Sequence, residues 1–250
     1  MIARTQEQLS DSLPHISVNG VIFRFADQRL EFAAARLAYD DLWMIAGGFI
    51  GQREDLNQAA LRILTEQTGE TDLTVRQFGI FGQADRNFLG EFANLTELGI
   101  PATLVEWISR RFITIGYYTV ISDRSVAPQL PPYFSETAWL GIEEADRLGL
   151  DHTDLVHAAL NALRTDLAYQ PVLLDFFPDT LTLPQLQQFF ESVLGRPVDR
   201  GNFRKRILRS AALVKVGQAP RGAGNRPPNL YRIDGDRYRA GLEVEVKLGF

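Results

Sequence analysis

The chain has 250 residues, of which 45% are hydrophobic and 23% charged, as in ordinary globular proteins. It contains no cysteine, which excludes disulfides and cysteine-bound zinc, and its net charge is −5. Neither an apolar run of about eighteen residues nor a basic-then-apolar signal pattern occurs, so we expect a cytoplasmic protein without a membrane partner.

Charge is distributed unevenly along the chain. Residues 1–181 hold 25 acidic and 13 basic side chains, whereas residues 182–240 hold 4 acidic and 12 basic ones. An acidic body joined to a compact basic segment indicates that the basic segment binds a polyanion such as a nucleic acid.

Apolar residues alternate with polar ones in several short segments of the first 140 residues, which is typical of β-strands. Strands are expected at residues 15–25, 30–37, 42–45, 74–81, 112–121 and 138–140, with a hairpin turn at 26–29. An irregular insertion at residues 88–109 leads into a helix near 103–111. Strands interspersed with helices in this way predict an α+β protein.

Residues 47–70 combine a glycine turn with an amphipathic helix. One face of that helix is formed by residues spaced three and four apart, which are Leu56, Ala59, Ala60, Ile63, Leu64 and Gln67. Gly69 follows at the position where helices commonly end in a left-handed residue, so we expect the helix to stop there.

This stretch resembles the Nudix box, the signature G-x5-E-x7-R-E-U-x-E-E-x-G-U of Nudix pyrophosphohydrolases. The matching positions are Gly48, Glu54, Arg62, Leu64, Glu66 and Gly69. Ile63 and Gln67 stand in place of two glutamates, and Glu70 stands in place of an apolar residue. The resemblance implies a Nudix-like α/β/α sandwich with a mixed sheet.

The two missing glutamates bear directly on catalysis. Residues 63, 66 and 67 share one side of the helix, where three carboxylates would hold Mg²⁺ against a diphosphate. The chain keeps only Glu66, so we expect no hydrolase activity, no resident metal and no cofactor, with Arg62 bracing Glu54 or Glu66. The alternative is an active Mg-dependent Nudix hydrolase of ADP-ribose or nucleotide sugars, in which Asp85 helps to rebuild the metal site.

From Asp151 onward the pattern is helical. Asp151 can cap a helix over residues 154–169, and the apolar segment 170–178 between two prolines is expected to be a packed junction. Thr182 then starts a helix that Gly195 ends.

A second helix follows at once, because Asp199 caps residues 200–211. Two short strands at 213–216 and 229–233 come next, joined by the loop QAPRGAGNRPP. A helix, a short turn, a helix and a β-hairpin form the winged-helix arrangement, with the arginine-rich loop as the wing.

The second of these helices, DRGNFRKRILRSAALV, has an inner face of Phe203, Ile207 and Leu208. Arginine and asparagine side chains read bases and hold phosphates, and recognition helices contact bases mainly through their N-terminal residues. The candidate DNA-binding residues are Arg200, Asn202, Arg204, Lys205, Arg206 and Arg209 on the helix and Arg221 and Arg226 in the wing. The alternatives are a solvated basic face and a surface for an acidic protein partner.

The Nudix-like region, the helix LTLPQLQQFFESVLG, the segment DRGNFRKRIL and the wing ending NLYRIDGDRYRAG together resemble the NrtR-type transcription regulators. The long insertion before WISRRFITIGYY is closer to the Bacteroidetes sugar-regulator subgroup, which is AraR-like. The resemblance implies a homodimer on palindromic operator DNA that responds to a small effector, either a sugar such as arabinose or an ADP-ribose-type nucleotide. Gly201 departs from the family, which usually has a second basic residue there.

Several side chains near the box are candidates for holding that effector. They are Arg36, Phe49, Glu66, Phe81, Asp85 and Arg86. The aromatic rings can instead belong to the core, and the Asp85–Arg86 pair can be a simple turn ion pair.

These patterns predict three regions. Residues 14–150 form a Nudix-like effector-sensing domain, residues 151–180 a connecting helix and junction, and residues 181–241 a winged-helix DNA-binding domain with an α+β fold. The predicted function is transcription regulation, as repressor or activator, by a winged helix that binds operator DNA under the control of a non-catalytic sensor.

Overall fold

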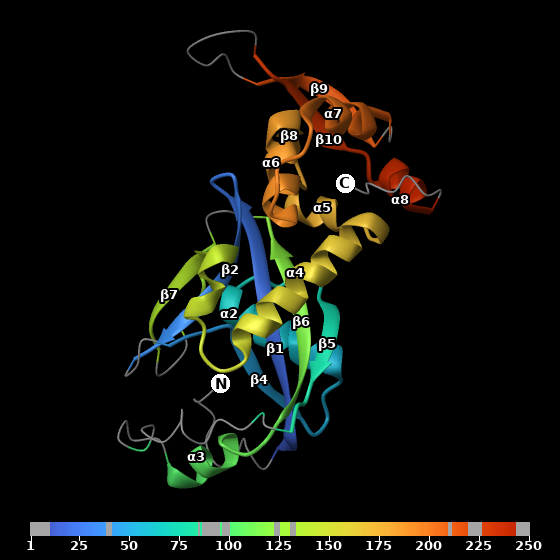
Figure 1. Ribbon diagram of the computed structural model, residues 1–250. Coiled ribbons are helices and arrows are strands. Elements are labelled where there is room, and N and C mark those ends of the chain that lie inside the picture. Colours follow the sequence, from blue (N-terminus) through green and yellow to red (C-terminus); the bar gives the residue numbers. More distant parts are fainter. Residues whose placement is uncertain are drawn as a thin grey trace. The chain divides into compact units, whose positions relative to one another are not determined.

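The computed structural model describes residues 11–38, 42–84, 86, 96, 101–122, 126–130, 134–209, 212–219 and 227–243. The chain forms two compact units (Figure 1). Unit 1 takes in residues up to 23 together with 31–120 and 125–159, and unit 2 takes in 24–30, 121–124 and everything from residue 160 onward.

Unit 1 is built on a seven-stranded mixed sheet. In chain order its strands are β1 (Ser12–Ala26), β2 (Arg29–Leu37), β3 (Trp43–Met44), β4 (Ala46–Gly51), β5 (Arg76–Phe81), β6 (Ile113–Ile121) and β7 (Phe134–Gly141). The strand order is β3-β2-β1-β6-β5, with β4 paired to β1 and β7 paired to β2.

The strand β4 corrects one prediction. Gly47 and Gly48 were expected in a turn, but they pair with β1, where Gly47 lies opposite Asn19 and Gly48 opposite Val18. By contrast, the hairpin turn between β1 and β2 is confirmed, because Asp27 (φ 48°) and Gln28 (φ 68°) both have left-handed backbone. Two such residues make the turn type that matches the twist of a hairpin.

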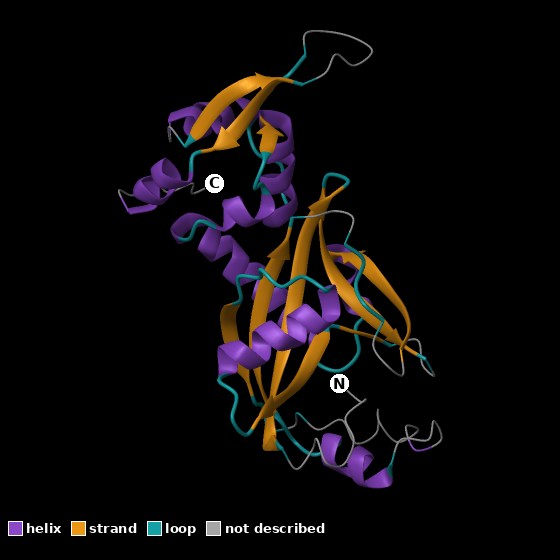
Figure 2. Cartoon of the chain, turned by 180° about the vertical axis from the view of Figure 1, so that it is seen from behind, coloured by secondary structure: helices purple, strands orange, loops and turns teal. Residues whose placement is uncertain are grey.

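Helices cover both faces of this sheet. They are α2 (Leu56–Thr68), α3 (Ala102–Ile108), the short 3₁₀ helix η2 (Ile142–Arg147) and α4 (His152–Tyr169), which continues into unit 2. Figures 1 and 2 show α2 on one face of the sheet and α4 on the opposite face, the predicted α/β/α sandwich.

The box helix α2 lies close to the sheet because two glycines leave room for it. A Cβ atom at Gly48 would lie 2.8 Å from the side chain of Ile63, and one at Gly20 would overlap the side chain of Leu64. Gly69 ends the helix at φ 77°, as predicted, and its N–H bonds to the carbonyl of Thr65. The Nudix box therefore keeps its shape although two glutamates are absent.

Helix α3 packs on the β-strands through an apolar cluster. The cluster consists of Leu37, Met44, Phe49, Leu104, Val105, Ile108 and Phe112, with Trp107 packed against it. Because Trp107 lies edge-on to Phe49 at 4.5 Å between ring centroids, the helix from the predicted insertion is part of the core of unit 1.

Unit 2 holds a small winged helix. Its elements are α5 (Val172–Phe176), β8 (Thr180–Thr182), α6 (Leu183–Leu194), α7 (Arg200–Arg209), β9 (Leu213–Gln218), β10 (Asn229–Ile233) and α8 (Gly235–Glu243). The three strands form an antiparallel sheet in the order β8-β10-β9. The predicted order of helix, turn, helix and β-hairpin is confirmed, whereas β8, α5 and α8 were not predicted as separate elements.

Candidate DNA-binding surface and effector domain

The turn between α6 and α7 sets the position of the candidate recognition helix. Gly195 ends α6 with a left-handed backbone (φ 67°), and the carboxylate of Glu191 accepts hydrogen bonds from Val198 N (3.0 Å) and Gln187 Nε2 (3.0 Å). Asp199 then caps α7, since its Oδ1 accepts from Asn202 N at 2.8 Å. The direction of α7 is therefore fixed by hydrogen bonds at its start.

One face of α7 is buried and the rest carries positive charge. Phe203 and Ile207 are 1% and 3% exposed and pack inward. Leu208 was also expected to face inward but is 41% exposed, because it lies about 100° further round the helix than Ile207. Arg200 and Arg204 are exposed.

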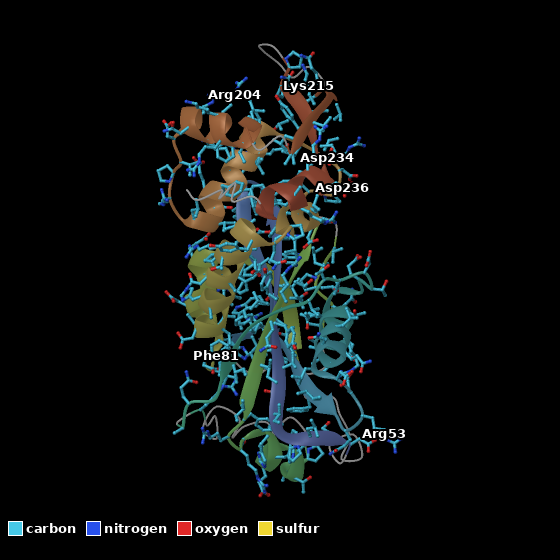
Figure 3. The ribbon with its side chains drawn as sticks, turned by 90° about the vertical axis from the view of Figure 1, so that its right-hand side faces the viewer. Arg53, Phe81, Arg204, Lys215, Asp234 and Asp236 are labelled. Atoms are coloured by element: carbon cyan, nitrogen blue, oxygen red, sulfur yellow. The ribbon has the colours of Figure 1, made fainter. Side chains whose placement is uncertain are left out.

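Three cationic side chains of α7 are available to a partner. Within the part of the chain that the structure describes, the side chains of Arg200, Arg204 and Lys205 have neither an ion pair nor a hydrogen bond, and Asn202 is also exposed. Arg204 and Lys215 of β9 both project from the surface of this unit (Figure 3). The arginines predicted in the wing, Arg221 and Arg226, and the side chain of Arg209 lie outside the described residues.

In unit 1, the guanidinium group of Arg62 forms hydrogen bonds with several residues of the Nudix box. Its Nε and Nη2 bond to the two oxygens of Glu54 at 2.7 and 2.9 Å, Nη2 also bonds to the carbonyl of Phe49 at 2.9 Å, and Nη1 lies 3.3 Å from Glu66. The hydrogen bonds and the negative charge of Glu54 raise the pKa of Arg62. The expected bracing role of Arg62 is confirmed.

The two substituted box positions serve packing. Ile63 is 4% exposed and fills the space against Gly48, as its place in the apolar stripe predicted. Gln67 donates through Nε2 to the carbonyl of Gln129 at 3.0 Å, and the N–H of Gln129 donates back to the carbonyl of Gln67 at 2.7 Å. Among the described residues, no three His, Cys, Asp or Glu side chains are grouped to hold a metal ion.

Two of the candidate effector residues are buried and make contacts within the protein. The ring of Phe49 is 2% exposed and packs against Trp107 and Phe112, so it offers no face to a ligand. Arg86 is also buried, with its Nε and Nη2 bonded to the carboxylate of Asp151 at 2.6 and 3.2 Å and its Nη1 bonded to the carbonyl of Phe112 at 3.0 Å. Phe49 and Arg86 therefore have structural roles, which corrects their prediction as effector-binding residues.

The Arg86–Asp151 pair shows how the structure differs from the sequence reading. The alternative to effector binding for Arg86 was a turn ion pair with its neighbour Asp85, which lies outside the described residues. Its actual partner is 65 residues away and precedes α4. Spacing along the chain gave no signal for this contact.

A third candidate, Arg36, lines a surface cavity of about 400 Å³ together with Trp43, Glu136 and Arg147. Arg36 pairs with Glu136 at 2.8 Å, and the guanidinium of Arg147 lies 5.1 Å from the ring centroid of Trp43. This cavity unites charged side chains of both signs with an aromatic ring, which suits a polar ligand.

The last two candidates lie apart from this cavity as far as the described contacts show. Phe81, at the end of β5, is half-buried and packs on Phe78 at 5.7 Å between ring centroids (Figure 3). Glu66 is exposed and pairs with Arg62. Neither residue lines the cavity beside Arg36.

Sequence reasoning also missed a buried polar cluster at the start of α4. His152 is 1% exposed, its Nδ1 accepts from Ile45 N at 3.3 Å, and its Nε2 lies 3.3 Å from the side-chain amide of Asn19. Asn19 also accepts from Thr114 at 2.7 Å. Burial lowers the pKa of His152 to about 4, so the ring is neutral near pH 7.

Comparison with known proteins finds a family match for each of two segments of the chain. Residues 13–159 match the NUDIX domain family, and residues 173–233 match the NrtR DNA-binding winged helix domain. The chain is 28% identical over 195 residues to the ADPR responsive transcriptional repressor NtrR of Acinetobacter baylyi, a match that covers 76% of this chain and 69% of that protein.

No helix in the described ranges is both long enough and apolar enough for a membrane crossing.

Solved structures are similar to this chain over most of its length. The crystal structure of Shewanella oneidensis NrtR has a TM-score of 0.65 and 26% identity, and the match covers 90% of this chain and 96% of that one. The same protein complexed with a 27mer DNA has a TM-score of 0.66 at 24% identity over 89% of this chain and 95% of that one, a likeness of fold. The chain belongs to the Nudix family, and its Nudix domain joined to an NrtR winged helix makes it an NrtR-type transcription regulator.

Proposed function

We propose that the chain controls transcription by holding operator DNA with α7, while its Nudix domain senses a small molecule without hydrolysing it. The observation that carries the DNA-binding surface is the exposed face of α7, where Arg200, Arg204 and Lys205 have no side-chain partner among the described residues. Cations left unpaired on a capped helix beside a β-hairpin suit contacts with phosphates and base edges. A homodimer would place two such helices on a palindrome.

The DNA-binding part is tested with DNA from upstream of the protein's own operon. We expect Arg204→Ala and Arg206→Ala each to weaken binding about tenfold near 0.1 M salt, because each removes a cation from the exposed side of α7. Arg110→Ala is the matched control, since Arg110 is an exposed arginine of unit 1 paired with Glu106. If the affinity measured by fluorescence anisotropy is unchanged in both α7 variants, the assignment of the recognition helix is wrong.

The absence of hydrolysis rests on the box. With Ile63 buried against Gly48 and Gln67 hydrogen-bonded to Gln129, only Glu54 and Glu66 remain of the box carboxylates, and both are bound to Arg62. Magnesium needs carboxylate oxygens that are free to coordinate it. We therefore expect no product from ADP-ribose incubated with Mg²⁺, whereas Mg-dependent turnover that disappears in Glu66→Gln would establish the hydrolase alternative.

The effector is the remaining part of the proposal, and the cavity beside Arg36 is its proposed site. Arg36 and Arg147 can meet phosphate oxygens, and the carboxylate of Glu136 can accept from ribose or sugar hydroxyls. The name of the Acinetobacter relative supports an ADP-ribose-type effector, whereas the long insertion before WISRRFITIGYY supports a sugar.

A thermal-shift comparison decides between the two effector classes. ADP-ribose, NAD, arabinose and glucose would be added to the wild type, to Arg36→Ala and to the control Arg110→Ala. We expect one class to raise the melting temperature of the wild type and of the control but not of Arg36→Ala, because binding to the folded state alone stabilises it. A shift that Arg36→Ala retains in full would move the effector site elsewhere.

A further inference from the structure

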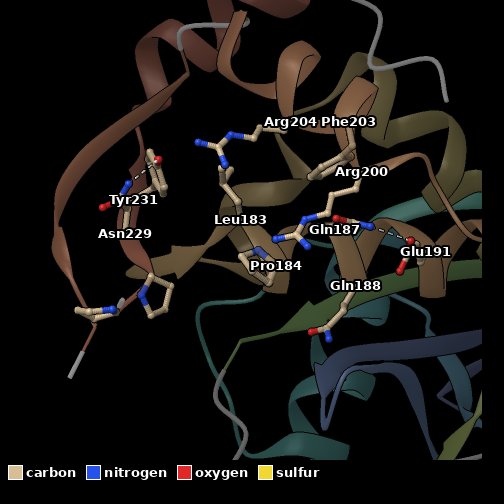
Figure 4. Close-up of a pocket in the computed structure, with 12 residues that line it drawn as sticks. Leu183, Pro184, Gln187, Gln188, Glu191, Arg200, Phe203, Arg204, Asn229 and Tyr231 are labelled. Atoms are coloured by element: carbon tan, nitrogen blue, oxygen red, sulfur yellow. Dashed lines mark hydrogen bonds between the residues drawn. The ribbon is translucent and has the colours of Figure 1, made fainter. Parts of the chain in front are cut away.

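A hollow of about 780 Å³ lies beside α7 within unit 2 (Figure 4). Three elements line it: α6 through Leu183, Pro184, Gln187, Gln188 and Glu191, α7 through Arg200, Phe203 and Arg204, and the start of β10 with the two residues before it through Pro227, Pro228, Asn229 and Tyr231. The hollow therefore lies between the recognition helix and the base of the wing.

The hollow is positively charged where α7 borders it. Arg200 and Arg204 are one helical turn apart, and Figure 4 shows both guanidinium groups pointing into the hollow. Glu191 is the acidic residue in the lining, and its carboxylate is already engaged by Val198 N and Gln187 Nε2 at 3.0 Å each. Within the described part of the chain, two cations without a side-chain partner thus face the hollow, and the carboxylate of Glu191 in its lining already accepts two hydrogen bonds.

The rest of the lining suits a chain of sugars and phosphates. Asn229 contributes an amide and Tyr231 a hydroxyl, while Leu183 and Pro184 give apolar surface; the amide of Gln188 already donates to Gln28 Oε1 at 2.7 Å. Asn229 Nδ2 donates to the Tyr231 hydroxyl at 3.4 Å, which holds the two side chains together on β10. Amide and hydroxyl donors contact phosphate oxygens, and apolar surface accepts the deoxyribose rings.

The other exposed polar residues of α7 face a different direction. At about 100° per residue, Asn202 and Lys205 lie roughly 100–200° round the helix from Arg200 and Arg204. Neither Asn202 nor Lys205 lines the hollow, although both are exposed. The helix therefore presents one cationic edge to the hollow and a separate polar face away from it.

Building on the proposed DNA binding, we infer that the hollow holds the sugar-phosphate backbone through Arg200 and Arg204, and that base reading falls to Asn202 and Lys205. Backbone contacts set affinity and register without regard to sequence, whereas base contacts set sequence preference. This division assigns Asn229 and Tyr231 to backbone binding and removes Arg200 and Arg204 from the base-reading set.

The test measures binding to two duplexes of equal length, the upstream DNA and an unrelated sequence, over a series of salt concentrations. We expect Arg204→Ala and Arg200→Ala to weaken binding to both duplexes by the same factor, about tenfold near 0.1 M salt, and to reduce the salt slope by about 0.9. Asn202→Ala should instead lower the preference for the upstream DNA and leave the slope nearly unchanged.

Arg204→Lys separates the two roles on the same position. A lysine keeps the charge for a phosphate, so we expect it to restore most of the salt slope and to leave the sequence preference as in the wild type. It lacks the planar fork of arginine, so it would not preserve a guanine contact that depends on that geometry. If Arg200→Ala or Arg204→Ala changes the preference between duplexes, these residues read bases and the inference is wrong. If the wild type binds neither duplex, the proposed function itself fails. Unchanged melting temperatures establish that the variants are folded.

Discussion

At the scale of single residues, Gly201 is the least expected member of α7. It lies in the first turn of the helix, at the position where it departs from the basic residue usual in the family that the sequence resembles. A Cβ atom there would meet only Asp199 Oδ1, at 3.5 Å, which is ordinary contact. The glycine is therefore not required by packing, and its flexibility weakens the start of the helix.

Gly201→Ala should stabilise the protein by up to about 1 kcal/mol, because alanine restricts the unfolded chain and favours helix. Urea unfolding of the two proteins measures this difference. Gly201→Arg should in addition steepen the salt dependence of DNA binding by one phosphate contact. A loss of stability in Gly201→Ala would mean that the Asp199 cap depends on the glycine.

His152 is the residue whose environment depends most on folding. Its Nδ1 accepts from Ile45 N and the ring is buried, so protonation would place a second donor opposite that N–H and leave a charge in the core. The folded pKa of about 4 lies below the ordinary value of 6.5. Between these values the unfolded chain binds more protons than the folded one.

The stability should consequently fall as pH is lowered. The contribution of His152 is fully present above pH 6.5 and is lost as pH falls toward 4, a change of about 3 kcal/mol. Urea unfolding at pH 7 and pH 4 would show that the decline is smaller by this amount in His152→Gln. His157→Gln is the control, because His157 lies on the same helix but is exposed. An equal decline in wild type and His152→Gln would contradict the assignment.

At the scale of elements, unit 2 is held together by a run of phenylalanine rings. Phe189 of α6 is 0% exposed and lies within 6 Å, centroid to centroid, of four other rings. These rings belong to Phe25, Phe176, Phe177 and Phe190, and Phe190 in turn contacts Phe203 of α7 at 5.7 Å. The position of the recognition helix thus depends on packing that starts at the tip of the β1–β2 hairpin.

Phe189→Ala should destabilise the protein by about 3–5 kcal/mol, since it removes a buried ring and leaves a cavity among four others. Tyr169→Ala is the aromatic control and should change the stability by less than about 0.5 kcal/mol, because Tyr169 is 58% exposed. Thermal unfolding followed by near-UV circular dichroism compares the two. A loss below about 1 kcal/mol in Phe189→Ala would show that the rings do not form a tight core.

Elements with strong local signals were predicted, and short ones stabilised by distant contacts were not. The helix at residues 183–194 carries its own cap, since Thr182 and Gln185 bond reciprocally. By contrast, the three-residue strand β8 exists because it pairs with β10, and α8 begins where Asp234 N bonds to the carbonyl of Ala212. The three residues of β8 and the five of α5 are too few for a periodic pattern to be visible, whereas α8 has nine residues and was missed although it is long enough.

At the scale of the whole molecule, three chain segments pass between the two units. The β1–β2 hairpin places its tip in unit 2, residues 121–124 follow β6 into it, and α4 divides between Ala159 and Leu160. An effector in the Nudix domain can act on DNA binding only if it has different affinities for the DNA-bound and free arrangements. Strand β1 runs from unit 1 into unit 2, where Phe25 contacts Phe189, so we expect any such coupling to pass along this strand.

We expect ADP-ribose, if it is the effector, to shift the melting temperature differently with and without upstream DNA, because linkage requires the two ligands to affect each other reciprocally. The measurement is a thermal shift with saturating ADP-ribose on the free protein and on the complex. Phe25→Leu removes the ring that packs on Phe189 and should reduce the difference between the two melting-temperature shifts. Equal shifts in both states would argue against coupling between effector and DNA.

The sequence by itself determined the two domains, the loss of the box glutamates at Ile63 and Gln67, and the basic helix at Arg200–Arg209, because each is written in spacings of a few residues. Only the tertiary structure decided that Phe49 and Arg86 are structural, that Arg36 lines a cavity, and that Arg200 and Arg204 face a hollow beside the wing. Those properties depend on residues tens of positions away, such as Asp151, which pairs with Arg86, and Asn229, which lines the same hollow as Arg200. Local periodicity carries no information about which distant segments meet.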